Sequence, residues 1–294
     1  TMRAEPASRD AFYTLAEIAW RHGDHAAAMR HLEEGLRLPL RPSESDSVFR
    51  PLFQVRQAMV TASSGDRAEA ERRFREAEQS LDALSRVVTG PDLSNVMFQL
   101  AVVRDALGDA DRVRSSLDAA LDATPDSRDA AARAVTFCLV RGRWADARDL
   151  ARRARAQLTL DRPWTVYFGL WGSAAARIGR LSDDGGAGAS LERVTASASD
   201  AAPWTTRIAQ HWLGTLDRAG LERYARTPGH RAEMFFYASL LHRAGGDTAA
   251  AEADLRAVVA TEVLRYFEYE MAWEMLARGG LRAPAAPPAS PAPR

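Results

Sequence analysis

Apolar residues recur at helical spacing along most of the chain, and residues 11–40 show this pattern most plainly. A first apolar face is followed, after the turn Gly23-Asp24, by a second one. The first face holds Phe12, Leu15, Ala16 and Ala19, and the second holds Ala28, Leu32 and Gly35. This spacing predicts two short amphipathic helices joined by a tight turn. The small residues on both faces allow the two backbones to approach closely.

The same arrangement returns four more times when the turn glycine is taken as the origin. A small or apolar residue lies seven positions before the glycine, and others lie five, nine and twelve positions after it. The turn glycines are Gly23, Gly65, Gly108, Gly142 and Gly246. Gly108 and Gly142 are 34 residues apart. A pattern that recurs in one frame at this period predicts stacked helix pairs.

This frame resembles that of the tetratricopeptide repeats (TPR), and the resemblance runs from residue 11 to about residue 277. It implies an all-α, right-handed superhelix of about seven helix pairs with a C-terminal capping helix. Units are expected near residues 11–40, 46–83, 93–125, 128–160, 164–198, 203–227 and 232–262, followed by a capping helix over 263–278. Residues 1–10 are expected to form an N-terminal arm, and the Pro/Ala-rich residues 281–294 a flexible tail.

The fifth and sixth units depart most from the frame. The fifth leads to Gly179-Arg180 and then to a segment rich in Gly, Ser and Asp, residues 182–190. This composition predicts a flexible loop, with the second helix beginning near Ser190. The 67 residues from Gly179 to Gly246 are about two periods. A degenerate sixth unit is therefore expected between them, with its turn near Gly214.

The resemblance also implies where a ligand would bind, on the first helix of each pair, at positions ten, six and three before the turn glycine. In this chain the positions taken as a partner-binding groove are Tyr13, Glu17, Trp20, Val55, Met59, Phe98, Val102, Asp105, Thr136, Leu139, Phe236, Leu240 and Arg243. This mostly apolar and aromatic lining suits an amphipathic or apolar protein segment, with the charged members setting its register. The basic clamp by which some TPR proteins hold an acidic C-terminal peptide is missing. Any one of these residues can instead pack against a neighbouring repeat.

The predicted final helix has two apolar faces. One of them can pack on the preceding unit, which leaves Tyr266, Tyr269 and Trp273 as a candidate interface. This interface would serve a partner or a second copy of the chain, and the alternative is that the Pro/Ala tail covers it. A cluster of arginines lies between residues 141 and 155, interleaved with Asp146 and Asp149. The interleaving favours a self-paired helix face over a docking patch for an acidic partner or RNA.

Composition narrows the classes of function. The chain has 39 basic and 39 acidic residues, which does not favour general nucleic-acid binding. All the basic residues are arginine, which indicates a GC-rich, bacterial genome. The single cysteine, Cys138, lies among apolar residues and is expected in the core. We recognise no catalytic motif, phosphate-binding loop or metal-ligand spacing, so no enzymatic activity, cofactor or metal is expected.

Together these features predict a non-catalytic scaffold or adaptor that binds a protein segment in its groove. One alternative is a regulatory or sensor module of a larger multidomain protein, such as an enzyme or a transcription regulator. Another is an envelope-associated assembly factor of a bacterial lipoprotein type. No apolar run approaches the ~20 residues of a membrane span. A cytoplasmic location is therefore expected, or a periplasmic one if a signal sequence has been removed, and a homo-oligomer through the final helix stays open.

Overall fold

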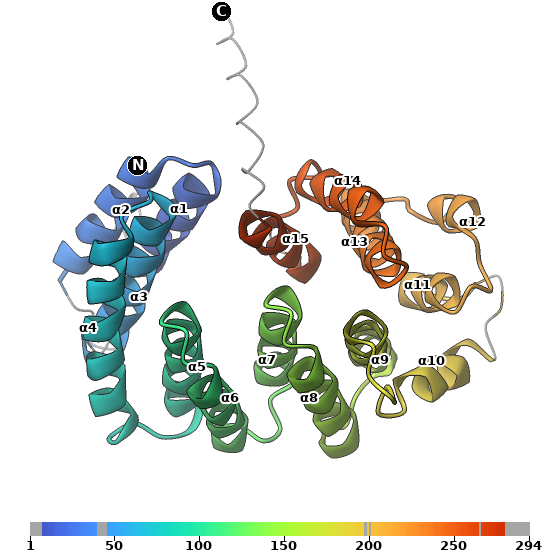
Figure 1. The fold of residues 1–294 in the computed structure, drawn as a ribbon, viewed down its shortest axis with the longest axis horizontal. Helices are drawn as coiled ribbons and strands as arrows, with labels where there is room; N and C mark the ends of the chain where they lie inside the picture. Colours follow the sequence, from blue (N-terminus) through green and yellow to red (C-terminus); the bar gives the residue numbers. More distant parts are fainter. Residues whose placement is uncertain (1–7, 40–45, 197–198, 200, 265, 280–294) are drawn as a thin grey trace, which may run out of the picture. The chain divides into compact units, whose positions relative to one another are not determined.

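The computed structural model describes residues 8–39, 46–196, 199, 201–264 and 266–279. Within these ranges the chain forms fifteen α-helices and no β-strand, which confirms the predicted all-α class (Figure 1). The helices are α1 (Arg9–Arg21), α2 (His25–Arg37), α3 (Asp46–Ser63), α4 (Arg67–Ser85), α5 (Gly90–Ala106), α6 (Ala110–Ala123), α7 (Arg128–Val140), α8 (Trp144–Gln157), α9 (Arg162–Gly179), α10 (Ala187–Thr195), α11 (Trp204–Trp212), α12 (Arg218–Glu222), α13 (Pro228–Ala244), α14 (Thr248–Val259) and α15 (Phe267–Arg278). Consecutive helices pack as seven pairs, α1 with α2 through α13 with α14, and α15 follows the last pair.

The chain divides into two compact units between Thr124 and Pro125. Unit 1 contains the pairs α1–α2, α3–α4 and α5–α6, and unit 2 contains α7 to α15. The predicted N-terminal arm, apart from its last three residues, and the predicted Pro/Ala tail lie outside the described residues. No helix in the described ranges is long and apolar enough to cross a lipid bilayer.

The turns of the repeat work as the sequence frame predicts. All five turn glycines have a positive φ, between 68° and 95°, which ends a helix at little steric cost. In four of the pairs the next residue is an aspartate whose side chain caps the second helix. Asp24, for example, accepts a hydrogen bond of 2.8 Å from the backbone N–H of Ala27. This Gly-Asp pair therefore stops one helix and starts the next within a few residues.

The frame also places the core correctly. The residues five, nine and twelve positions after each of the five turn glycines are all buried. Leu15 is the exception on the first helix, because 44% of it is exposed, whereas its counterpart in the third pair, Leu100, is buried. No described helix precedes α1 to cover Leu15. The buried Cys138 packs in the core, as predicted.

The turn of the fifth pair differs from the prediction. Gly179 is the last residue of α9, and it is Arg180 that takes the left-handed conformation, with φ 50°. Helix α10 begins at Ala187, three residues before the predicted start. Hydrogen bonds stabilise the loop between them: the carboxylate of Asp184 accepts from the backbone N–H groups of Gly186 and Gly188.

Helix α15 does more than cap the last pair. It contacts α14 and α13 and also α7, the first helix of unit 2. An ion pair joins Arg141, at the end of α7, to Glu274 on α15 at 2.6 Å, and only 5% of the Arg141 side chain is exposed. Both predicted apolar faces of the final helix are thereby used, since Met271 and Leu276 are each 3% exposed. The first and last parts of unit 2 are held together by its final helix.

Candidate functional site

The three predicted groove residues of the first pair contact the next repeat. Arg56 on α3 donates a hydrogen bond of 2.8 Å to the hydroxyl of Tyr13 and lies 2.5 Å from a carboxylate oxygen of Glu17. Its guanidinium also lies over the ring of Trp20, 5.0 Å from the centroid. The indole N–H of Trp20 donates to the hydroxyl of Ser63 at 2.9 Å. The structure thus brings Tyr13, Glu17 and Trp20 together around one arginine of the second pair.

The groove positions of the second and third pairs differ in their exposure. Val55 is 1% exposed and belongs to the core of unit 1. Met59 on α3 and Val102 on α5 pack against that same core and remain partly exposed. Phe98 and Asp105, also on α5, are partly exposed as well. Helix α3, which carries Met59, contacts α5, which carries Phe98, Val102 and Asp105.

In unit 2 most of the corresponding positions are covered. Thr136 and Leu139 on α7 are 8% and 0% exposed, and Phe236 and Leu240 on α13 are both 0% exposed. Helix α15 contacts both α7 and α13, which carry these residues. Arg243 is exposed and lies over the ring of Trp144, 5.2 Å from the centroid.

The three aromatic residues predicted as a C-terminal interface lie in different surroundings. Tyr266, the residue before α15, is 39% exposed, while Tyr269 is 5% exposed and packs inside unit 2. Trp273 is partly buried. Tyr266 is therefore the most accessible of the three.

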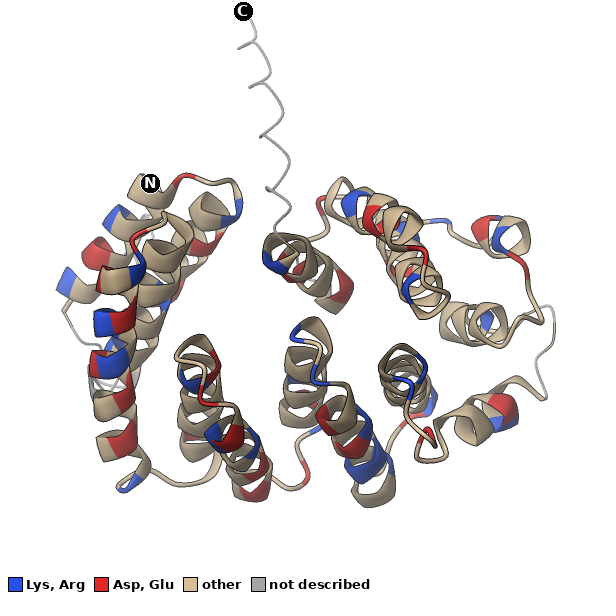
Figure 2. Cartoon of the chain, viewed as in Figure 1, with Lys and Arg blue, Asp and Glu red and all other residues tan. Residues whose placement is uncertain are grey.

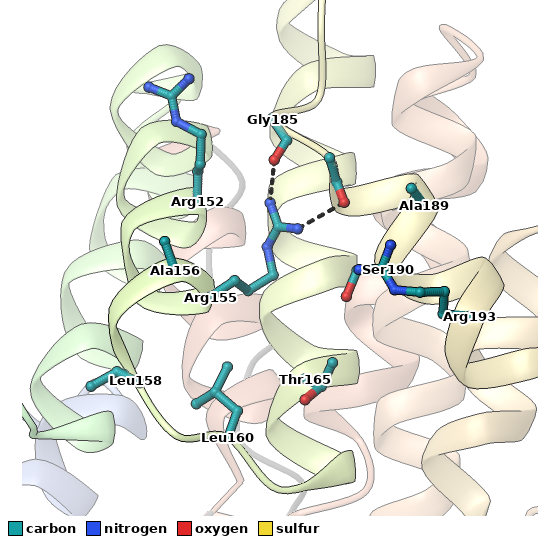
Figure 3. A pocket seen from close by; sticks show the side chains of 11 residues that line it. Arg152, Arg155, Ala156, Leu158, Leu160, Thr165, Gly185, Ala189, Ser190 and Arg193 are labelled. Atoms are coloured by element: carbon teal, nitrogen blue, oxygen red, sulfur yellow. Dashed lines mark hydrogen bonds between the residues drawn. The ribbon is translucent and has the colours of Figure 1, made fainter.

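The arginine cluster on α8 lines one side of a cleft of about 490 Å³ between α8, α9 and α10. Figure 2 shows acidic and basic residues in the first half of α8 and basic residues in its second half. Figure 3 shows Arg155 reaching across the cleft to the loop before α10, where it donates hydrogen bonds of 2.8 Å to the carbonyl oxygens of Gly185 and Gly186. Burial lowers the pKa of Arg155. Arg155 therefore fastens the loop.

The other two arginines of the cleft do not join Arg155 in a clamp. The guanidinium of Arg152 points away from that of Arg155 in Figure 3 and lies 3.1 Å from the carboxylate of Asp149. Arg193, on α10, is exposed at the far wall. An anion would need several of these groups to converge, and they are spread around the rim instead.

Two buried carboxylates in unit 2 were not predicted as site residues. Glu233 on α13 is 5% exposed, and Glu268 on α15 is 3% exposed. Burial raises the pKa of Glu268 to about 8, and the charge of Glu233 adds to this shift. Burial also raises the pKa of Glu233, against the opposing effect of hydrogen bonds from Trp204 and Tyr167. The one signal in the sequence is the spacing of Trp164, Tyr167 and Trp171 on α9, which places three aromatic side chains on one side of a helix beside these acids.

Among the described residues, no group of three or more His, Cys, Asp or Glu side chains is placed to hold a metal ion. No protein-family model matches the sequence, and no curated protein matches it.

Two solved structures illustrate what the fold is similar to. A tetratricopeptide repeat protein from Parabacteroides merdae is 12% identical, with a TM-score of 0.36, over 91% of this chain and 98% of that one. The C-terminal part of a TPR repeat-containing protein from Cytophaga hutchinsonii is 12% identical, with a TM-score of 0.37, over 88% of this chain and 98% of that one. The assignment of the fold rests on the helix pairs and turn glycines of the chain itself. By these features the chain is an all-α helical-repeat protein with TPR-like helix pairs.

Proposed function

We propose that the chain is a non-catalytic protein-interaction module and that unit 1 carries the binding surface. The observation that supports this is the partly exposed apolar surface formed by Met59, Phe98 and Val102 on α3 and α5. These positions correspond to the ligand-facing ones of the TPR frame. Met59 and Val102 pack on the core of unit 1 and remain partly exposed, so an apolar protein segment would gain burial there without rearranging the core.

Asp105, at the end of α5, gives this surface a charged edge that would set the register of a bound segment. Glu17, the other acidic residue among the predicted groove positions, pairs with Arg56. In unit 2 helix α15 covers the corresponding positions. A contact between two copies of the chain would rest on Tyr266 and Trp273, since Tyr269 is buried.

The test uses peptides selected from a random displayed library against the full-length chain. We expect selection of amphipathic or apolar sequences, and we expect Phe98→Ala and Val102→Asp each to weaken binding of a selected peptide by about tenfold or more. Met97→Ala is the matched control, because Met97 is partly buried against the same core but lies outside the ligand-facing frame. Equal affinities for the wild-type chain and the Phe98 and Val102 variants would refute the proposal.

A further inference from the structure

A small cavity of about 190 Å³ lies between α9, α13 and the start of α15, and its walls are largely aromatic. It is lined by Trp164, Tyr167, Trp171, Glu233, Tyr266, Phe267 and Glu268. The ring of Phe267 stands nearly perpendicular to two others, at 75° and 6.1 Å from Trp164 and at 74° and 6.2 Å from Trp171. These rings meet edge to face, while Tyr167 stacks on Trp171 at 5.9 Å with 22° between the ring planes, so aromatic rings in several orientations line the cavity.

Tyr266 forms the outer edge of this cavity. Its hydroxyl lies against Gly229 at the start of α13, where a Cβ atom would come within 2.2 Å of the hydroxyl oxygen. Tyr266 is 39% exposed, so the cavity opens to the surface beside it. A cavity smaller than the ~300 Å³ of a typical small-molecule site suits a compact head group more than a whole drug-sized ligand.

The two acidic side chains in the wall, Glu233 and Glu268, are buried without a basic partner in the described part of the chain. Glu233 accepts hydrogen bonds from the hydroxyl of Tyr167 at 2.9 Å and from the indole N–H of Trp204. Glu268 accepts one from the hydroxyl of Tyr237 at 3.1 Å. Within the described part of the chain, neither acid forms an ion pair with an arginine or histidine, and all three of these donors are neutral. Burying a carboxylate without a counter-charge is costly unless it takes up a proton or a cation.

The indole N–H of Trp171 indicates that a ligand of this cavity also carries a hydrogen-bond acceptor. Trp171, another lining residue, is 1% exposed, and its indole N–H is buried without an acceptor. Native proteins rarely leave such a donor unpaired, and an unfilled ligand site is one reason for doing so.

We propose that this aromatic and acidic cavity of unit 2 binds a quaternary ammonium head group, such as a trimethylammonium. Aromatic faces attract a cation through the electrostatic field of their rings, and a bound cation favours the ionised form of the two acids, which then supply the opposite charge. Both oxygens of Glu233 already accept hydrogen bonds, which leaves few acceptors for the N–H groups of a primary amine. A quaternary nitrogen needs no acceptor, and its methyl groups pack against the rings. An oxygen next to the head group satisfies the indole N–H of Trp171.

The test compares ligands of one shape on the wild-type, full-length chain. Choline is titrated by calorimetry and by tryptophan fluorescence, alongside its neutral isostere 3,3-dimethylbutan-1-ol. We expect choline to bind and to change the fluorescence, and the neutral isostere to bind at least tenfold more weakly. A short peptide containing trimethyl-lysine forms a second arm, since the same head group occurs in free molecules and on modified proteins. Absence of binding by both cationic ligands at millimolar concentration, or equal binding of the neutral isostere, would overturn the proposal.

Variants locate the binding within the cavity. Phe267→Leu keeps an apolar side chain but removes a ring face, and Glu233→Gln removes a charge while keeping the size of the side chain. We expect each to weaken choline binding at least fivefold. Trp144→Leu is the matched control, because Trp144 is a partly buried aromatic residue of unit 2 that does not line this cavity. Unchanged affinity in both cavity variants would place the binding elsewhere and contradict the proposal, and the comparison of isosteres holds even if a variant fails to fold.

Discussion

Two glycines of unit 2 show that this residue serves different purposes in similar places of the repeat. Gly246 has a φ of 83°, and a Cβ atom there would meet no other atom within 4 Å. Glycine is therefore needed at this position for its left-handed backbone conformation, not for lack of space. Gly179 is helical, and a Cβ atom there would lie 2.5 Å from the Cβ of Trp144. Gly179 therefore allows α9 to approach the start of α8 closely, while Arg180 takes the left-handed turn position.

The close approach at Gly179 predicts the effect of adding one methyl group. Gly179→Ala should destabilise the chain by about 1–3 kcal/mol, because α9 or Trp144 must shift to relieve the overlap. Gly245→Ala is the control, since a Cβ there would meet only carbonyl oxygens at 3.5 Å or more and its φ is negative. That variant should be neutral or slightly stabilising. Urea unfolding measures both, and equal stability of the two variants would contradict the prediction.

Glu268 links stability to pH through its burial. Its pKa is about 8 in the folded chain, against about 4.5 for an unperturbed glutamate. Between these values the folded state holds a proton that the unfolded state releases, so raising the pH favours unfolding. The groups that face Glu268 are Glu233 and Tyr237 on α13 and Tyr167 on α9, with Tyr266 beside the cavity. None of them supplies a positive charge.

The expected outcome is a loss of stability as the pH rises from about 5 to 8, by up to about 1.4 kcal/mol per pH unit from this group alone. Glu268→Gln removes the ionisable group and should flatten the dependence. The free energy of unfolding of both proteins is measured with denaturant at pH 5, 6.5 and 8. The difference between them at each pH gives the contribution of Glu268. Parallel curves for the wild type and the variant would show that Glu268 does not titrate in this range.

At the scale of whole elements, α15 is held by a charge pair as well as by apolar burial. Glu274 lies 2.6 Å from Arg141 on α7 and also pairs with Arg278 on its own helix. Removing the carboxylate abolishes this ion pair at a guanidinium that is only 5% exposed.

We therefore expect Glu274→Ala to destabilise the docking of α15 by about 2 kcal/mol. Amide hydrogen exchange should then speed up across α15 and the end of α7. Glu252→Ala is the matched control, because the exposed pair of Glu252 and Arg256 lies within α14 and contributes about 0.5 kcal/mol or less. If both variants exchanged like the wild type, apolar packing alone would hold α15.

The elements themselves could be predicted from the sequence because the repeat frame is local. A turn glycine followed by an aspartate marks two helix ends at once, so the pairs built on Gly23, Gly108 and Gly246 follow from spacing alone. The turn of the fifth pair was predicted less accurately. Gly179 lies at the expected position but is helical and packs closely against Trp144, and Arg180 takes the left-handed conformation of the turn.

The candidate sites were harder to predict, because they depend on contacts between distant segments. The frame identifies ligand-facing positions by analogy, and it cannot show that Phe236 and Leu139 are buried or that α15 contacts the helices that carry them. It also treats a glutamate on a helix as solvent-exposed. Glu233 and Glu268 become buried only because α9, α13 and α15 meet, which brings together residues separated by up to about a hundred positions in the sequence.

At the scale of the whole molecule, the ligand-facing positions of the repeat differ in burial between the two units. In unit 1 the first helices α3 and α5 leave Met59, Phe98 and Val102 partly exposed. In unit 2 the equivalent face of α7 and α13 is buried, and α15 contacts both helices. The corresponding helix positions are therefore more deeply buried in unit 2, where α15 contacts both helices, than at these three residues of unit 1.

Deleting the chain from Val263 onward should uncover the face in unit 2. Leu139, Phe236 and Leu240, each 0% exposed, then lose the cover of α15, and the truncated chain should bind a hydrophobic dye such as ANS more strongly than the full chain. Hydrogen exchange should accelerate in α7 and α13 and stay unchanged in α3 and α5, because unit 1 has its own core. Unchanged dye binding together with preserved protection of α7 would mean that the pairs of unit 2 close over this face without α15. Accelerated exchange in both units alike would instead mean that they unfold as one cooperative body.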